Sequence, residues 1–367
     1  MDRSQKQGER HEMLIDHDKL RAIAKRVFEA GGSSAEEAGI VSDHLIEANL
    51  RGHDSHGVGM IPRYVGNLRL GTVTPNRKGR ILKESGAIVA YDGERGYGQV
   101  VAAAATRLAI ERAEKNGVSV VALRNAHHIG RVGTYGEMCA EAGLVSVHFV
   151  NVIGHNPIVA PHRGGDARLS TNPLCVAVPA AEPGRPIILD MATSKVALGK
   201  VRVAKNRGVA MGPAHIIDSG GKPTTDPNAM FQKPTGAILP MAEHKGYALA
   251  FICELLAGAI GGGGTLRPEN QGLDTITNCM LSFVIDPSRI AERDWMRDEI
   301  LAITRYVTAS PAQNPGEPVL IPGDPERLSR LERAKNGVPL DAETWREIVN
   351  AGESLGLRVE APNMSAS

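Results

Sequence analysis

A polar predicted helix ends at the stretch His53-Asp54-Ser55-His56-Gly57-Val58-Gly59-Met60-Ile61-Pro62-Arg63-Tyr64. This stretch places two imidazoles, a carboxylate and a hydroxyl at the end of a helix. Histidine titrates near neutral pH, and a neighbouring Asp or Ser can fix which ring nitrogen carries the proton. Such residues give or take a proton when a carbonyl is reduced or an alcohol is oxidised. Because a His-rich loop is more often an ordinary surface loop, the chemical interpretation depends on the rest of the chain.

Short helices flank this stretch. Apolar residues recur at helical spacing from Leu20 to Phe28 and stop at Gly31-Gly32. Ser34 with Glu37 forms a capping box for a second helix that ends near Leu50. A third helix is expected from about Met60 to Leu70, because Pro62 is tolerated in a first helical turn. These helices deliver the stretch 53–64.

The middle of the chain predicts a mixed α/β segment. Strands are expected at 88–91, 118–123, 145–150, 174–178, 187–189 and 277–285, and helices at 102–115, 134–142 and 246–260. A Rossmann assignment needs G-x-G-x-x-G directly after a first strand, and that string is absent. Gly130, Gly133 and Gly136 have the wrong spacing. We therefore expect any dinucleotide to be bound by a non-Rossmann fold.

Composition restricts the partners and the compartment. With 42 basic and 41 acidic residues the net charge is +1. The chain therefore has no excess of positive charge that would attract nucleic acid or an anionic membrane. Small molecules are the expected partners. The four cysteines are scattered without CxxC spacing, as in a reducing cytoplasm. Residues 1–12 lack the apolar core of a signal peptide, and no apolar run is long enough to span a bilayer, so we expect a cytoplasmic protein.

Three later stretches strengthen the chemical interpretation of residues 53–64. They are Asn125-Ala126-His127-His128-Ile129-Gly130-Arg131, Leu189-Asp190-Met191-Ala192-Thr193-Ser194 and Glu243-His244-Lys245-Gly246-Tyr247. Together with the first stretch they resemble the malate/L-lactate dehydrogenase family of the non-Rossmann type, and the resemblance runs from about Leu20 to about Ile348. It implies a largely antiparallel sheet with helices, in a homodimer whose active site lies near the subunit contact.

The expected organisation is therefore a helical domain built from both chain ends and a central cofactor domain. Residues 1–80 together with 286–367 would form the mainly helical domain, and residues 81–285 the α/β cofactor-binding domain. The sequence contains no internal repeat and no obvious flexible linker.

The resemblance also implies chemical roles. Hydride transfer to a 2-oxo acid needs a proton donor, a cation or donors for the carboxylate, and a wall for the nicotinamide. His56 resembles the family's catalytic histidine, with Ser55 beside it, and His128 matches a second histidine that some members use as acid or base. His127 is more readily explained as a packed neighbour. Asp190 would orient a histidine or receive a cofactor hydroxyl, and a strand-end cap is the ordinary explanation.

The cofactor, NAD or NADP, would contact several short segments. By resemblance these are His56, Gly130, Arg131, Val132, Ile188, Leu189, Asp190, Met191, Ala192, His244, Lys245, Asn278, Gly323, Asp324, Pro325 and Glu326. Many relatives carry Glu where Asp324 stands, so that edge of the site departs from the family pattern. The basic run from Lys200 to Arg207 is typical of a solvated helix face, with a cofactor phosphate as the alternative.

Met60 bears on the substrate, because many family members place a carboxylate-binding arginine there. Arg63 or Arg131 would then bind the carboxylate, and Met60 would leave room for a larger side chain. This favours a broad range of 2-hydroxy and 2-oxo acids as substrates, including aromatic ones.

Two alternative functions remain open. A metal-dependent hydrolase lacks H-E-x-x-H and a third ligand beside His53 and His56, so no metal is expected. The other alternative is a dimeric ligand-binding protein that binds the cofactor but has no catalytic turnover.

Overall fold

The computed structural model describes residues 13–359, which form two compact units. One unit contains the chain up to Arg69 and again from Glu326, and the other is Leu70–Pro325. The domain limits that the sequence predicted, after residue 80 and before residue 286, stay predictions. Residues 1–12, on which the prediction of no export signal rests, lie outside the described part. Within that part, no helix is long and apolar enough to cross a membrane.

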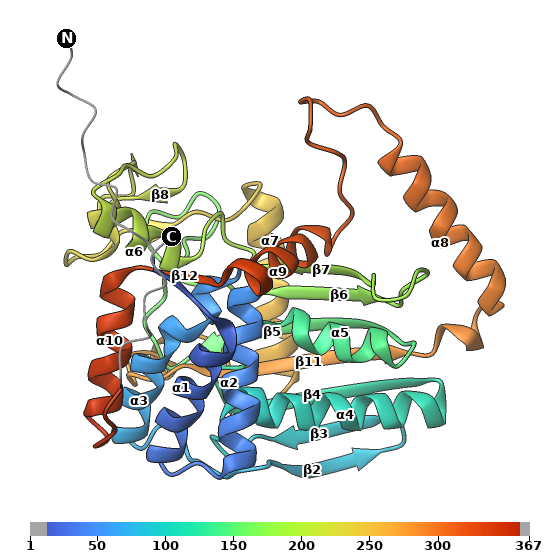
Figure 1. Cartoon of the computed structure of the whole chain (residues 1–367), viewed down its shortest axis with the longest axis horizontal. Helices are drawn as coiled ribbons and strands as arrows, with labels where there is room; N and C mark the ends of the chain where they lie inside the picture. The colour runs from blue at the N-terminus through green and yellow to red at the C-terminus, as the bar shows by residue number, and fades with distance from the viewer. Residues whose placement is uncertain (1–12, 360–367) are drawn as a thin grey trace. The chain divides into compact units, whose positions relative to one another are not determined.

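A seven-stranded sheet forms the centre of the unit Leu70–Pro325 (Figure 1). Its order is β2-β3-β4-β11-β5-β6-β7, and neighbouring strands are antiparallel except β3 and β4. The strands are β2 (Arg80–Ser85), β3 (Ile88–Asp92), β4 (Val118–His127), β11 (Thr277–Ile285), β5 (Val145–Ile153), β6 (Leu174–Val178) and β7 (Ile187–Met191). The predicted mixed α/β fold with a largely antiparallel sheet is confirmed.

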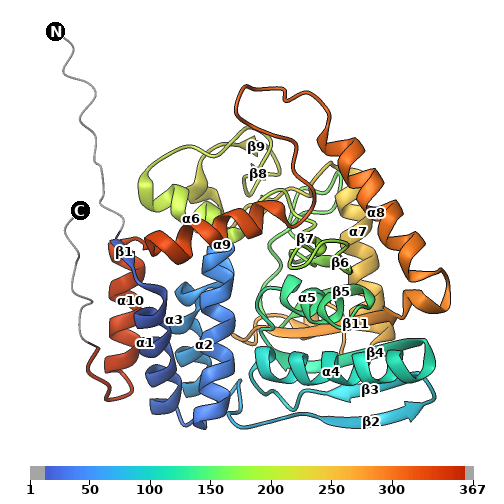
Figure 2. The same cartoon turned by 45° about the vertical axis from the view of Figure 1, so that its right-hand side comes forward.

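Two helices pack side by side against this sheet (Figure 2). They are α4 (Gly98–Asn116) and α5 (Gly133–Glu141). The inner face of α4 consists mostly of alanines, including Ala105 and Ala109, which are buried against β4 residues such as Leu123. Small side chains let the helix lie close to the strand. Gly117, with φ 83°, ends α4 in the left-handed conformation that glycine adopts without strain.

The remaining elements of this unit surround the sheet. The apolar helix α7 (His244–Cys253) continues as a π-helical segment, Glu254–Ile260, which packs against β5 and β11. A small sheet of β10 (Ala237–Ile238), β8 (Ile216–Ile217) and β9 (Pro223–Thr224) packs with α6 (Leu198–Arg207) around a second apolar cluster. Short 3-10 turns occur at Pro227–Met230, Pro268–Asn270 and Pro287–Arg289.

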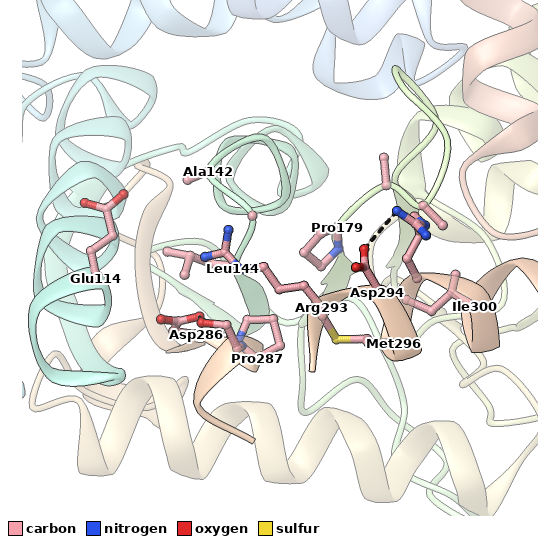
Figure 3. A pocket seen from close by; sticks show the side chains of 15 residues that line it. Glu114, Ala142, Leu144, Pro179, Asp286, Pro287, Arg293, Asp294, Met296 and Ile300 are labelled. Carbon is pink, nitrogen blue, oxygen red and sulfur yellow. Dashed lines mark hydrogen bonds and ion pairs between the residues drawn. The ribbon is translucent and has the colours of Figure 1, made fainter. Parts of the chain in front are cut away.

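Helix α8 (Arg293–Thr308) stands away from the sheet in both views of the fold (Figures 1 and 2). None of its 16 residues is buried. Its first turns border an open cavity of about 480 Å³. Figure 3 shows Arg293, Met296 and Ile300 of α8 beside this cavity, with Leu144 and Pro179 among the other lining residues. The cavity contains none of the predicted site residues.

The strand β5 carries a buried histidine, His148, between two serine hydroxyls. Its Nδ1 lies 2.8 Å from Ser282 Oγ, and its Nε2 lies 3.0 Å from Ser146 Oγ. Burial lowers the pKa of His148 to about 4. The folded protein therefore holds this imidazole neutral at pH values where an unfolded chain would protonate it.

This histidine makes the stability depend on pH. Because its folded pKa is depressed, the contribution is fully present above pH 6.5 and is lost as the pH falls towards 4. His148→Gln should reduce the loss of unfolding free energy between pH 7 and pH 4.5 by about 2.5 kcal/mol. Urea unfolding of both proteins at the two pH values measures this. Equal pH dependence in the two proteins would contradict the prediction.

The other unit is helical and joins both ends of the chain. Its helices are α1 (His17–Ala30), α2 (Ala35–Leu50), α3 (Ile61–Arg69), α9 (Asp324–Asn336), whose first two residues belong to the other unit, and α10 (Ala342–Glu353). β1 (Met13–Ile15) pairs with β12 (Val338–Leu340). The predicted cap of α2 is present, since Ser34 Oγ accepts a hydrogen bond from the Glu37 backbone N–H. Leu20, Val27 and Phe28 of α1 are buried, as their helical spacing predicted.

Candidate active site

The candidate catalytic stretch forms two consecutive 3-10 turns between α2 and α3. They are Asp54–His56 and Val58–Met60. Ser55 Oγ lies 3.0 Å from His56 Nδ1, and both side chains are half-buried. A hydrogen bond at one ring nitrogen fixes the tautomer of the imidazole and so defines the role of the other. The arrangement can therefore present His56 Nε2 as the atom that gives or takes a proton.

Asn49, a buried residue of α2, holds this turn in place through its side-chain amide. Its Nδ2 donates to Asp54 Oδ1 at 2.6 Å, and its Oδ1 accepts from the Val58 backbone N–H at 2.8 Å. Arg333 of α9 donates to both oxygens of Asp54, at 2.7 and 3.1 Å. The sequence analysis missed Asn49 and Arg333. The sequence carried no local signal that separates Asn49 from the other buried polar residues of α2, such as Ser42 and His44.

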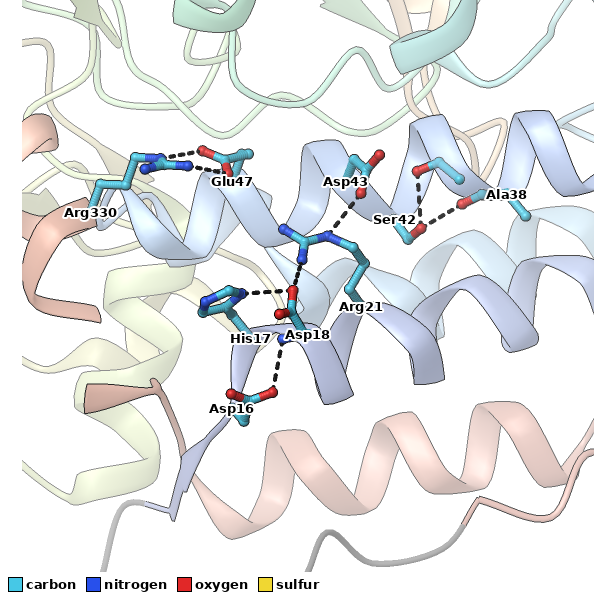
Figure 4. A network of polar contacts seen from close by, with 10 residues as sticks. Asp16, His17, Asp18, Arg21, Ala38, Ser42, Asp43, Glu47 and Arg330 are labelled. Atoms are coloured by element: carbon cyan, nitrogen blue, oxygen red, sulfur yellow. Dashed lines mark hydrogen bonds and ion pairs between the residues drawn. The ribbon is translucent and has the colours of Figure 1, made fainter. Parts of the chain in front are cut away.

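Further ion pairs fasten α9 beside α2. Arg330 binds both oxygens of Glu47, at 2.9 and 3.1 Å (Figure 4). Burial alone would raise the pKa of Glu47, but the hydrogen bond and the charge of Arg330 hold that pKa below its ordinary value. His53 Nε2 lies 3.4 Å from Glu326 Oε1. Glu326 thus belongs to the same unit as His56, and its carboxylate faces His53.

A β-bulge precedes the second histidine stretch. The register of β4 against β11 shifts between Asn278 and Met280, opposite Asn125, which has φ 54°. Bulges bend a strand and are over-represented next to active sites. His127 is buried, and its ring lies edge-on to Tyr97 with centroids 6.1 Å apart, as a packed neighbour would. His128 is only half-buried.

Arg131 and Asp190 lie together in the protein interior. Arg131 is 2% exposed and donates to both oxygens of Glu137, at 3.1 and 2.9 Å. Its Nε lies 3.6 Å from Asp190 Oδ2, which also accepts the Gly133 backbone N–H at 2.8 Å. Burial alone would lower the pKa of Arg131, but Glu137 and Asp190 hold it above its ordinary value.

These contacts bear on two of the roles considered from the sequence, which stay predictions. The Arg131 guanidinium is occupied by carboxylates and closed to solvent, so it cannot reach a substrate without breaking a buried ion pair. Arg63, which is half-buried on α3, remains the candidate for the substrate carboxylate. The Asp190 carboxylate contacts Arg131 and the backbone at the start of α5.

The segment Ile188–Ala192 lies on an edge strand of the sheet. In the described part of the chain β7 pairs with β6 alone, and the Ile188 backbone N–H donates to Pro322 O at 3.1 Å. This hydrogen bond places the segment that begins at Pro322, with Gly323 and Pro325, beside β7. Asp324 is buried and accepts two hydrogen bonds from Arg185, at 3.0 and 2.7 Å. Its carboxylate is thus used within the protein.

The other predicted cofactor contacts lie in different environments. His244 and Lys245 are exposed at the start of α7, and the His244 ring lies 5.8 Å from that of His162. Asn278 is buried, and both of its amide atoms bind backbone groups. In α6, Lys200, Arg202 and Arg207 are exposed, as a solvated face would be. Among residues 13–359, no three His, Cys, Asp or Glu side chains are grouped as a metal site would need.

The sequence and the fold match those of known proteins. A family model described as malate/L-lactate dehydrogenase matches residues 15–349. The chain is 46% identical over 348 residues to hydroxycarboxylate dehydrogenase B of Escherichia coli K12, covering 94% of this chain and 95% of that protein. It is 37% identical to L-lactate dehydrogenase of Cupriavidus necator, covering 95% and 99%. The solved structure of malate dehydrogenase from Pyrococcus horikoshii superposes with a TM-score of 0.84 at 29% identity, covering 96% and 99%. The chain belongs to the malate/L-lactate dehydrogenase family.

Proposed function

We propose that the protein is an NAD(P)-dependent oxidoreductase that interconverts 2-hydroxy acids and 2-oxo acids, with a histidine as proton donor and acceptor. The family, whose relatives carry names of hydroxycarboxylate, lactate and malate dehydrogenases, supports an oxidoreductase acting on hydroxy acids. The observation that carries the mechanism is the Ser55 Oγ to His56 Nδ1 contact of 3.0 Å on a turn held by Asn49 and Arg333. In oxo-acid reduction His56 gives its proton to the forming alkoxide, and in the reverse direction it takes the proton back.

The residues of the Leu70–Pro325 unit fit a nicotinamide cofactor, which would supply or accept the hydride. Among residues 13–359, no strand pairs with the outer edge of β7, so the backbone there, beyond the Ile188 N–H that Pro322 accepts, can meet a ligand. Exposed Lys245 at the N-terminus of α7 places a cation beside the positive end of a helix dipole, an arrangement that favours a pyrophosphate. His128 would close the site beside the nicotinamide or share the proton transfer. The proposal covers NAD and NADP alike.

The substrate proposal rests on Met60, which is half-buried at the end of the second turn. A thioether adds apolar surface and removes the charge that would attract a second substrate carboxylate. Phenylpyruvate should therefore be reduced with a higher kcat/KM than oxaloacetate. Met60→Arg should shift the preference towards the diacid by about 1.5 to 3 kcal/mol, the scale of a charged hydrogen bond.

One kinetic panel tests both the reaction and the substrate. Wild type and Met60→Arg are assayed with NADH and NADPH against pyruvate, oxaloacetate, glyoxylate and phenylpyruvate. Turnover unchanged by EDTA is expected, and loss on chelation with recovery on zinc addition would favour the metal hydrolase instead. No oxidation of either cofactor would support the silent binding protein. A wild type that prefers oxaloacetate would show that another cation binds the second substrate carboxylate, although Met60 stands where many relatives have arginine.

A homodimer completes this proposal, and α8 supports it. Trp295 and Tyr306 of this helix are 62% and 79% exposed, and Ile303 and Val307 lie exposed near them. An amphipathic helix with no buried residue leaves its apolar side in water, which favours coverage by a second copy of the chain.

The oligomeric state can be tested on this helix. Trp295→Ser with Tyr306→Glu should convert a dimer into a monomer in analytical ultracentrifugation, because the apolar surface is lost and a charge is introduced. Asp294→Ser, at a strongly exposed position on a different side of α8, should leave the dimer intact. A monomeric wild type would contradict the proposal.

A further inference from the structure

Glu254 is a buried carboxylate in the helix that follows α7. It is 5% exposed and is the first residue of the π-helical segment. Within residues 13–359, no Arg, Lys or His forms an ion pair with it. Burying a carboxylate costs several kcal/mol unless hydrogen bonds replace its water. An apolar side chain would fill the same space without that cost, so the carboxylate must serve through its contacts.

Three N–H donors surround the Glu254 carboxylate. Asn151 Nδ2 donates to Oε1 at 3.0 Å, and the Leu266 backbone N–H donates to the same oxygen. Asn172 Nδ2 donates to Oε2 at 2.7 Å. Asn151 and Asn172 are completely buried. Hydrogen bonds to a charged acceptor are about twice as strong as neutral ones. The carboxylate therefore fixes three separate segments, which contain Asn151, Asn172 and Leu266.

The first of these segments leads to His128. The Asn151 carbonyl oxygen accepts from Asn278 Nδ2 at 2.9 Å, and Asn278 Oδ1 accepts from the Ile129 backbone N–H at 3.0 Å. Ile129 directly follows His128. Hydrogen bonds therefore connect Glu254 to the histidine stretch through Asn151, whose side chain binds Glu254 and whose backbone carbonyl binds Asn278.

The second segment leads to the edge strand β7. Asn172 has φ 29°, a strained value that its two side-chain hydrogen bonds, to Glu254 and to Ala250 O, hold in place. Thr193 Oγ1 donates to Thr171 O at 2.8 Å and to Asn172 O at 3.2 Å. Thr193 directly follows Ala192, the last residue of the predicted cofactor segment on β7.

The π-helical segment itself allows this arrangement. A Cβ at Gly258 would lie 2.5 Å from Asn151 Nδ2, so only a glycine at that point leaves room for the Asn151 amide. The same helix begins at His244 and Lys245, ten residues before Glu254. π-bulges inside helices are frequent at functional sites.

We propose that Glu254 is a positioning residue that fixes the His128 stretch, the β7 segment and the α7 helix relative to one another, without touching cofactor or substrate. This inference rests on the proposed function, in which these three segments line the cofactor. It assigns Asn278 the same kind of role, because both of its amide atoms are bound within the protein.

Glu254→Gln tests the proposal because it keeps the size of the side chain. One acceptor oxygen becomes an NH₂ group that faces an N–H donor, so at least one of the three contacts is lost. Isothermal titration with NADH and NADPH should show cofactor binding weakened about tenfold, and kcat should fall about 10- to 100-fold, the scale of a misplacement near 1 Å. KM for the 2-oxo acid should change by less than about threefold, because Arg63 lies outside this network.

Val284→Ala is the matched control for lost stability. Val284 is buried in β11, six residues beyond Asn278, and has no polar contact in the network. This variant should lower Tm and leave cofactor affinity and kcat unchanged. If Glu254→Gln does not fold, Asn278→Ser interrupts the path to Ile129 and leaves the three donors of Glu254 in place, and kcat should still fall.

The outcomes separate the two proposals. An active wild type with a Glu254→Gln variant that binds cofactor and turns over like Val284→Ala would overturn the positioning role alone. A wild type that binds cofactor without turnover would overturn the proposed reaction, and the titration would still decide the role of Glu254. A wild type that binds neither cofactor would overturn both.

Discussion

His56→Ala is expected to lower kcat by about 100-fold or more, the usual scale of general acid catalysis, while the protein stays folded. Alanine removes the imidazole that we propose gives its proton to the alkoxide, and the turn keeps Asn49, Asp54 and Arg333. The backbone of the turn should therefore persist. Circular dichroism and Tm should match wild type, and cofactor binding should weaken, because His56 is also a proposed cofactor contact.

His127, the last residue of β4, and His128, which follows it, serve as comparisons for this result. His127→Ala should change kcat far less, because His127 is buried beside Tyr97 and away from solvent. Steady-state kinetics of the three alanine variants separate the roles. If His128→Ala abolished turnover while His56→Ala mainly weakened cofactor binding, the two proposed roles would be exchanged.

Gly98→Ala should disturb both stability and turnover, because the first residue of α4 lies against the backbone of the β4 end. A Cβ there would lie 2.2 Å from His127 O and 2.3 Å from His128 O, far inside van der Waals contact. The carbonyls cannot rotate away as a side chain would. Either α4 or the His128 stretch must move, at a cost of about 1 to 3 kcal/mol, and kcat should fall up to about 100-fold.

Gly39→Ala is the matched control, since a Cβ at Gly39 in α2 meets nothing within 4 Å. It should leave kcat unchanged and raise stability slightly, because alanine favours a helix by about 1 kcal/mol over glycine. Chemical unfolding and kinetics of both variants provide the measurement. A Gly98→Ala protein with wild-type Tm and kcat would mean that the helix start yields without strain.

Local signals predicted most of the secondary structure. Ser34 caps the start of α2 and the left-handed Gly117 caps the end of α4, as the sequence predicted, because capping depends on a few adjacent residues. The strand β2 (Arg80–Ser85) was missed, since its residues are mostly exposed and show no alternating apolar pattern. The order of strands was also out of reach, because β11 enters the sheet between β4 and β5 through contacts distant in sequence.

The candidate site was predictable in its residue types and much less in its contacts. The sequence and the family resemblance identified Arg131 and Asp190, but only the fold shows that they bind each other and Glu137. Asn49 and Glu254 were not singled out at all. Their importance depends on donors from remote segments, and residue spacing along one segment carries no record of such partners.

The ion pair between Arg333 and Asp54 has a consequence for the order in which the protein is made. The two residues are 279 positions apart, and Arg330 and Glu47 are separated by 283. During synthesis the turn with His56 leaves the ribosome long before its guanidinium partner. The nascent chain therefore carries this turn without the Arg333 contact until Arg333 has been translated, and the ion pair must then close a long loop.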